Sequence, residues 1–279
     1  MKKLLIASCI GLSYLTCHAA TNTLNNQQTT LLQEQLIEKQ DSTALCIPAL
    51  EVKIIPLINK EVSLPFKEKF VSYSYKIETA ETNLTWINQQ LLDSLISNLD
   101  TKEKDIKTKQ ELIHFYQRTQ NVEQKALQDF LNEMDIGMAS DENIYSSTLT
   151  FLGQRFNIVS FQRETYEYNI GAAHGLGLVK LLNFDLNKKK LLSLQDIVIP
   201  GKQQDIRNLL WQQYNVEVME NNPFIEKASF HISPNFLFNV EGIYFIYQPY
   251  EIGPYSMGNI KLKLSWDEAK DFIKKEYLW

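Results

Sequence analysis

The sequence has 279 residues, of which 44% are hydrophobic and 22% charged, and these values are typical of a folded globular chain with one large domain or two small ones. The formal net charge of −5 excludes the strongly basic surface of a typical nucleic-acid-binding protein, so we expect no nucleic acid as a partner. Without the first twenty residues, 26 basic residues face 33 acidic ones and the net charge is −7. This charge favours a cationic protein partner through the association rate, although solubility alone also explains it.

The first twenty residues have the organisation of a secretory signal peptide. Lys2 and Lys3 precede an apolar run, and Ala19 and Ala20 offer small residues for cleavage. The run is shorter than the ~20 residues of a bilayer-spanning helix, and no later segment is long and apolar enough. We therefore expect residues 1–20 to be a signal peptide, the mature protein to be periplasmic, and no integral membrane segment to remain. A lipoprotein attached through Cys17 is the less favoured alternative, because the preceding residues form a poor lipidation signal.

Residues 21–44 are rich in Asn, Gln and Thr and are expected to form a polar linker. Cys46 is the only cysteine after the leader, so an intramolecular disulfide is excluded. Strands are expected at 51–55 and 70–77, where β-branched and aromatic residues recur and the second segment alternates clearly.

Two amphipathic helices are predicted next, over about 86–99 and 107–134. Gly137 is expected to end the second helix. The buried face predicted for that helix comprises Leu112, Phe115, Tyr116, Val122, Leu127, Phe130, Leu131 and Met134. Together with the first strands, these helices form an expected N-terminal α+β subdomain over residues 45–139.

From residue 140 onward the pattern is rich in strands. A hairpin is expected with its turn at Gly153, followed by strands over 164–169 and 178–186, a helix near 206–218, and strands over 235–240, 243–248 and 259–264. Ser265 and Glu268 form a capping box that opens a last helix. Segregated runs of strands and helices predict an α+β fold with mainly antiparallel sheets, helices packed on them, and two subdomains, the second over 140–279.

A glycine-rich turn near residue 174 is the first candidate site. Gly171 and Gly175 flank His174, and glycine permits backbone shapes and close approaches that other residues resist. Catalysis by His174 would need a partner such as Glu167, Asp185 or Glu251, and their spatial relation does not follow from the sequence. The preferred interpretation is a buried imidazole bonded to backbone groups of the turn. We expect no catalytic residue, no metal site and no cofactor.

The second candidate site is the loop at 249–258. Its prolines should hold a fixed shape, and its aromatic residues suit contact with a protein or a glycan. Packing of the tyrosines against the core is an equally good alternative. The binding residues predicted from this loop are Pro249, Tyr250, Glu251, Pro254 and Tyr255.

Six motifs follow one another in the region from about 140 to 275. They are Tyr168-x-x-Gly171-Ala-Ala-His174-Gly175, Leu182-Asn-Phe-Asp185-Leu, Leu192-x-Leu-x-Asp196-Ile, Asn235-Phe-x-Phe, Glu241-Gly242-Ile-Tyr-Phe and Pro249-Tyr-Glu-Ile-Gly-Pro-Tyr-x-x-Gly258. Together they make the region resemble the RsiV-type C-terminal domain, a domain of otherwise unknown function that occurs in the lysozyme-binding anti-sigma factor RsiV and beside peptidoglycan deacetylase domains. Ala172 stands where that family usually has a second glycine.

The resemblance implies an extracytoplasmic protein that binds a cationic lysozyme-like muramidase or peptidoglycan. Neither a sigma-binding segment nor a deacetylase domain is visible in the sequence, so we expect neither activity. The function predicted is therefore a non-catalytic periplasmic binding protein that recognises or inhibits a lysozyme-like enzyme. A cell-wall glycan-binding module and an envelope hydrolase that uses His174 are the alternatives.

Overall fold

The structure is a computed structural model that describes residues 49–97, 99, 105–134 and 141–279. The expected signal peptide, the polar linker, Cys46 and the helix stop at Gly137 lie outside the described residues. The described residues form one compact unit. None of the described helices combines the length and the apolarity needed to cross a membrane.

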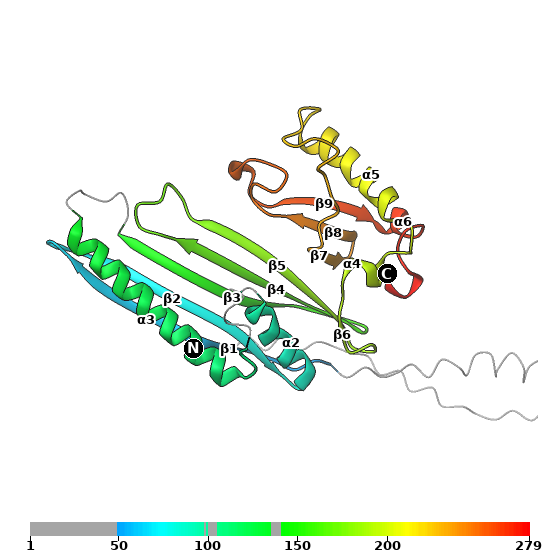
Figure 1. The fold of residues 1–279 in the computed structure, drawn as a ribbon. Helices are drawn as coiled ribbons and strands as arrows, with labels where there is room; N and C mark the ends of the chain where they lie inside the picture. Colours follow the sequence, from blue (N-terminus) through cyan, green and yellow to red (C-terminus); the bar gives the residue numbers. More distant parts are fainter. Residues whose placement is uncertain (1–48, 98, 100–104, 135–140) are drawn as a thin grey trace, which may run out of the picture. The chain divides into compact units, whose positions relative to one another are not determined.

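A long hairpin begins the fold (Figure 1). It joins β1 (Val52–Phe66) to β2 (Lys69–Thr82), and Lys67 has a positive φ of 51° in the turn between them. The alternation predicted for the second strand is confirmed, because Tyr73, Tyr75 and Ile77 point inward and are at most 2% exposed. Both strands extend well beyond the segments expected from the sequence.

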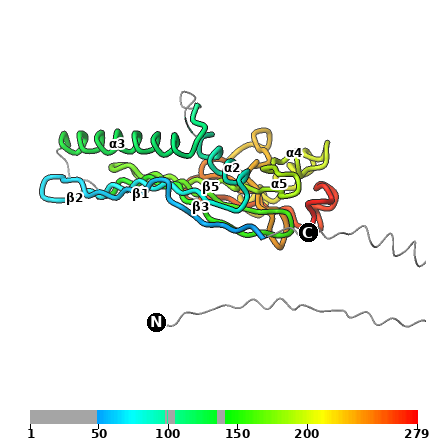
Figure 2. Tube along the Cα trace, turned by 90° about the horizontal axis from the view of Figure 1, so that it is seen from below, coloured from blue at the N-terminus to red at the C-terminus, as the bar shows by residue number. Residues whose placement is uncertain are grey.

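Two helices cover one face of the sheet that this hairpin starts (Figure 2). They are α2 (Thr85–Ile96) and α3 (Lys109–Glu133), and α3 opens with a capping box between Thr108 and Glu111. The predicted buried face of α3 is right at Leu112, Tyr116, Leu127 and Leu131. It is wrong at Val122 and Phe130, which are 69% and 44% exposed, because an isolated 25-residue helix has only a narrow stripe in contact with a single sheet.

The first sheet has six strands in the order β1-β2-β3-β4-β5-β6. The additional strands are β3 (Glu142–Arg155), β4 (Ile158–Tyr168), β5 (Leu176–Asp185) and β6 (Lys190–Leu191). All neighbours are antiparallel except β2 and β3, which pair in parallel. The α+β class and the mainly antiparallel pairing are therefore confirmed. This sheet takes strands from both sides of residue 140, where a subdomain boundary was expected.

The turn predicted at Gly153 lies elsewhere. The β3–β4 turn falls at Phe156 and Asn157, and Gly153 occupies a bulge in β3 where the register shifts. Its φ of 142° explains the glycine at this position, because such a backbone suits a bulge and not a regular strand.

The second sheet is three-stranded, in the order β7-β8-β9, with β7 (Phe236–Asn239), β8 (Gly242–Tyr247) and β9 (Ile260–Ser265). Its core is completed by α5 (Gln203–Gln213), which runs on into a π-helical turn, η2 (Tyr214–Val218), and by the short helices α4 (Leu194–Ile197) and α6 (Trp266–Ala269). The chain ends after a 3₁₀ turn, η4 (Lys275–Tyr277). The capping box predicted at Ser265 and Glu268 is confirmed.

Candidate functional site

The glycine turn between β4 and β5 presents His174 to solvent. Gly171 has a positive φ of 84°, and the Tyr168 hydroxyl donates to the carbonyl of Ala172 at 3.4 Å. The Nδ1 atom of His174 lies 3.0 Å from the carbonyl oxygen of Gly175. The predicted backbone contact is therefore present, but the predicted burial is wrong, because the turn projects beyond the sheet and leaves the ring uncovered by core residues.

The loop from 248 to 258 begins with a tight turn whose third residue is Tyr250. The amide of Glu251 donates to the carbonyl of Gln248 at 3.0 Å, and Pro249 takes the second position of the turn, which its fixed φ suits. Tyr250 has a φ of 70°, at a position where glycine or asparagine is usual in turns of this kind. Its side chain is 54% exposed. The turn therefore holds the Tyr250 ring in a fixed place that is open to solvent.

The rest of this loop carries a second tyrosine at its 3₁₀ turn, η3 (Tyr255–Met257), directly after Pro254. The turn closes with the amide of Met257 donating to the carbonyl of Pro254 at 3.0 Å. Gly258 follows with a positive φ of 62° and returns the chain to β9. The two prolines and this glycine thus hold the loop in one shape.

The two predicted sites meet. The rings of His174 and Tyr255 stack with centroids 3.8 Å apart and an interplanar angle of 19°. The Tyr250 hydroxyl lies 3.2 Å from Nε2 of His174, and the Tyr255 hydroxyl donates to the carbonyl of Gly175 at 2.6 Å. We call His174, Tyr250 and Tyr255 the His174 cluster. Segments about 75 residues apart in sequence therefore build one aromatic surface, which neither motif alone predicts.

Gly175 lets an additional aromatic ring approach this cluster. A Cβ atom at position 175 would lie 2.3 Å from the Tyr166 hydroxyl oxygen, so only glycine leaves room for Tyr166 as it stands. Tyr166, Leu176, Leu178 and Met257 are each about 40% exposed. The exposed aromatic and apolar side chains near the glycine turn thus extend beyond the three residues of the cluster.

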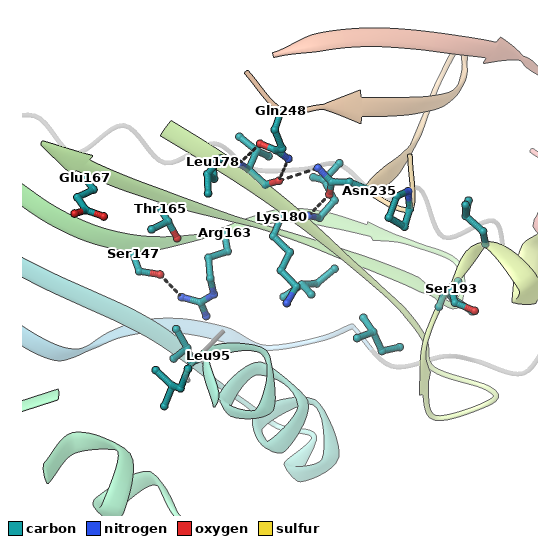
Figure 3. A pocket seen from close by; sticks show the side chains of 18 of the residues that line it. Leu95, Ser147, Arg163, Thr165, Glu167, Leu178, Lys180, Ser193, Asn235 and Gln248 are labelled. Carbon is teal, nitrogen blue, oxygen red and sulfur yellow. Dashed lines mark hydrogen bonds between the residues drawn. The ribbon is translucent and has the colours of Figure 1, made fainter. Parts of the chain in front are cut away.

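The side-chain amides of Asn235, just before β7, and Gln248, just after β8, hold the 248–258 loop beside β5. β6 pairs only with the end of β5, and amide groups serve as partners along the earlier part of that edge. Gln248 accepts from the Val179 amide at 2.9 Å and donates to its carbonyl at 2.6 Å, while Asn235 accepts from the Leu181 amide at 2.7 Å and donates to Val179 at 2.8 Å (Figure 3). These bonds imitate a strand pairing, so they fix the start of the 248–258 loop against the strand that follows His174.

Glu251 does not join the His174 cluster. One carboxylate oxygen lies 2.8 Å from Nε2 of His231, and the other accepts from the backbone N–H of Gln248 at 2.7 Å. Glu251 therefore braces the tight turn from within and links it to the segment before β7. His231 was not among the predicted site residues, and its sequence surroundings carry no motif that would have identified it.

Among the described residues, His174 is bonded to the Gly175 carbonyl and the Tyr250 hydroxyl, and not to the carboxylates expected as its partners. The Gly175 carbonyl can only accept, so Nδ1 carries a proton and, in the neutral ring, Nε2 accepts from the Tyr250 hydroxyl. The carboxylates proposed as its partners have other bonds: Glu167 accepts from Asn169, and Asp185 accepts from Asn157 and Tyr277. An acid that orients the imidazole, as in a hydrolase triad, is therefore not found at His174 in the described part of the chain.

The part of the chain that the structure describes contains no group of three or more His, Cys, Asp or Glu side chains that could hold a metal ion. The cluster as it stands offers aromatic faces, two hydroxyl groups and an imidazole. These groups suit the recognition of a surface by stacking and hydrogen bonding.

Comparisons with known proteins find a family model that matches part of the chain. Residues 187–267 match the model of a family described as a protein of unknown function, DUF3298. The matched segment includes the 249–258 loop and ends before η4, and it does not include His174. No curated protein matches the sequence.

Two solved structures resemble the fold. A member of the DUF3298 family from Bacteroides fragilis NCTC 9343 aligns with a TM-score of 0.60 and 20% identity, over 81% of this chain and 94% of that one. A DUF3298 family protein from Pseudomonas aeruginosa PAO1 aligns with a TM-score of 0.52 and 17% identity, over 81% and 95% of the two chains. At these identities the likeness concerns the fold.

Proposed function

We propose that this chain is an exported, non-catalytic binding protein that contacts a protein partner through the His174 cluster. The observation that carries the proposal is the convergence of the two loops, with Tyr250 exposed on a backbone of positive φ. Rigid, exposed aromatic side chains on short loops are the usual anchors of protein interfaces. The same loops carry the motifs that resemble the RsiV-type domain.

That resemblance supports a cationic lysozyme-like muramidase as the partner. The net charge of −7 after removal of the leader would speed the approach of a cationic protein, and this contribution should weaken as salt increases. Inhibition follows if the partner's catalytic cleft is covered. Export to the periplasm is part of the proposal, and it is tested by the mass of the mature chain, which should begin after Ala19 or Ala20. A mature chain that begins at a lipidated Cys17 would contradict this cleavage.

Calorimetry with a purified lysozyme at two salt concentrations tests the partner. The decisive variant is Tyr250→Gly, which removes the ring at a position where glycine adopts the same backbone freely, so the free energy of unfolding should change by less than about 1 kcal/mol. We expect at least a tenfold loss of affinity, the usual effect of removing an interface anchor.

Phe156→Gly is the matched control, because Phe156 is also an aromatic residue with positive φ, is 72% exposed, and lies in the β3–β4 turn. It should bind as the unaltered protein does. Equal losses in both variants would contradict the assignment to the His174 cluster. Absence of heat with any lysozyme, together with unimpeded lysis of cell walls, would remove the muramidase as the partner.

A glycan is the second candidate ligand, and a separate observation favours it. A cleft of about 410 Å³ lies between the two sheets and is lined by amide, hydroxyl and charged groups, among them Gln162, Asn239, Tyr244 and Asn259. The side-chain oxygen of Asn259 is buried and has no hydrogen-bond partner among the described residues. Such groups suit sugar hydroxyls. The test is co-sedimentation of the protein with peptidoglycan. If Asn259→Ala abolishes co-sedimentation and Tyr250→Gly does not, the glycan is favoured over the protein partner.

A further inference from the structure

A cleft along β5 contains a buried arginine whose guanidinium has two nitrogens without a hydrogen-bond partner among the described residues. The cleft has a volume of about 750 Å³, and Leu95 of α2, Leu99 after that helix and Tyr116 of α3 also line it. Arg163 on β4 is 1% exposed, and its guanidinium points from the sheet toward Leu95 (Figure 3). Arg163 was not among the predicted site residues, and it occupies an inward position in a strand whose other inward residues include Val159 and Phe161.

Only one nitrogen of this guanidinium is bonded. Nη1 donates to the carbonyl of Glu78 at 2.9 Å and to the Ser147 hydroxyl at 3.2 Å. Nε and Nη2 are buried and have no hydrogen-bond partner among the described residues. These two nitrogens form the side-on edge of the guanidinium, whose parallel N–H bonds match the two oxygens of a carboxylate. An unmet edge of this kind is costly in a folded protein unless something binds there.

A second cation faces the same cleft. Lys180 on β5 is the direct cross-strand partner of Arg163 and also lines the cleft. Like charges at directly opposite positions are unfavourable in a sheet. Burial, followed by the charge of Arg163, lowers the pKa of Lys180, and burial lowers the pKa of Arg163 to about 10, so the arginine keeps its charge at neutral pH. Arg163 and Lys180 together therefore give this wall of the cleft a positive potential.

The carboxylates near Arg163 are engaged with other groups. Glu78 lies 2.7 Å from the Lys76 ammonium and accepts from the Leu149 amide. Glu167 accepts from Asn169 at 2.6 Å. Neither therefore meets the side-on edge of Arg163. The rest of the wall is mostly apolar, with leucines at positions 95, 99, 178, 182, 191 and 192.

We propose that this cleft binds a small apolar carboxylate, with its carboxylate on Nε and Nη2 of Arg163 and its chain along the leucines. The volume lies in the range of sites for small organic ligands. Because both nitrogens are closed to solvent, the side chains that cover them must move when the ligand binds. Lys180 contributes charge at the same wall. This site is separate from the His174 cluster and does not depend on it.

Decanoate is a suitable probe, with 1-decanol as the uncharged probe of equal chain length and acetate as the charge without the chain. Calorimetry on the mature protein should show saturable binding of decanoate below 1 mM, with at least tenfold weaker binding of the other two probes. No binding of decanoate, or equal affinity for 1-decanol, would overturn the proposal.

Substitutions test whether Arg163 is the residue that contacts the carboxylate of decanoate. Arg163→Lys keeps the charge but loses the planar edge, so decanoate should bind at least tenfold more weakly, whereas Arg118→Lys on the exposed side of α3 should leave affinity unchanged. Lys180→Met leaves Arg163 in place and should weaken decanoate severalfold, which keeps the test decisive if position 163 does not tolerate change. Undiminished decanoate affinity in folded Arg163→Lys, or in Lys180→Met when the other variant does not fold, would refute the site.

Discussion

At the scale of single residues, Tyr250 and Arg163 have a property in common. Each is held in an unfavourable state that the surrounding structure fixes, namely a left-handed backbone at Tyr250 and an unmet donor edge at Arg163. Such states persist only where the surrounding structure fixes them, and at Arg163 a bound ligand would also relieve the unmet edge.

Two glycines allow a prediction at this scale. A Cβ atom at Gly242 would lie 2.2 Å from the backbone oxygen of Leu264, and the φ of 150° is itself unfavourable for alanine. Gly242→Ala should therefore lower the free energy of unfolding by more than about 2 kcal/mol. Gly175→Ala meets only the end of the Tyr166 ring, which is exposed and can swing away, so its cost should stay below about 1 kcal/mol. Urea unfolding measures the cost of each substitution, and equal losses of stability in the two variants would contradict the prediction.

At the scale of elements, the amide bonds on β5 carry a prediction of their own. Asn235→Ala leaves the Leu181 amide unbonded and removes one of the two donors to the Val179 carbonyl. The loss of a partner for a part-buried amide should cost about 1–3 kcal/mol. The hydrogen exchange of the Leu181 amide should accelerate accordingly. Gln204→Ala, which removes only an exposed contact to Asn208 on α5, is the control and should leave both quantities unchanged.

Acid sensitivity is expected at the link between β6 and α4. Burial alone would raise the pKa of Asp196, but hydrogen bonds from Lys190 and Ser193 outweigh it and lower the pKa to about 2 from an ordinary 3.8. A carboxylate with a depressed pKa stabilises the fold above its unfolded pKa, and this contribution is lost as pH falls from about 4 to 2. Because Lys190 is half exposed, we expect about 1 kcal/mol. Urea unfolding between pH 5 and 2 should show a shallower pH slope in Asp196→Asn but not in Asp271→Asn.

At the scale of the whole molecule, local patterns in the sequence predict the elements but not their neighbours. The alternation of β2 and the capping box at Ser265 follow from side-chain periodicity and local bonding, and both are confirmed. The parallel pairing of β2 with β3 is set by the packing of α2 and α3 on the sheet, which no local pattern encodes. The contact of His174 with Tyr250 likewise depends on the register of β5 against the second sheet. The inward position of Arg163 likewise does not follow from the sequence, because residue 163 falls just before the strand expected over 164–169, whereas β4 runs without a break from Ile158 to Tyr168.

The core beneath α2 predicts how the molecule unfolds. One hydrophobic cluster contains Ile87 and Leu91 from α2 together with Phe161 and Phe184 from strands beyond residue 140. Amide bonds then tie β5 to the second sheet. Since interactions of both kinds cross between the segments, loss of either part should expose apolar surface in the other, and unfolding should be a single cooperative transition.

Leu91→Ala tests this cooperativity, because Leu91 is fully buried and its truncation should cost about 2–5 kcal/mol. The full decrease in the free energy of unfolding should also be seen at the second sheet, where Trp211 and Trp266 pack against the core and report on it by fluorescence. In a Trp86→Phe background, in which α2 contributes no tryptophan signal, fluorescence and far-ultraviolet circular dichroism should give the same lowered urea midpoint. If tryptophan fluorescence kept its original midpoint while circular dichroism shifted, the second sheet would be an independently folding unit and the amide bonds on β5 only a surface contact.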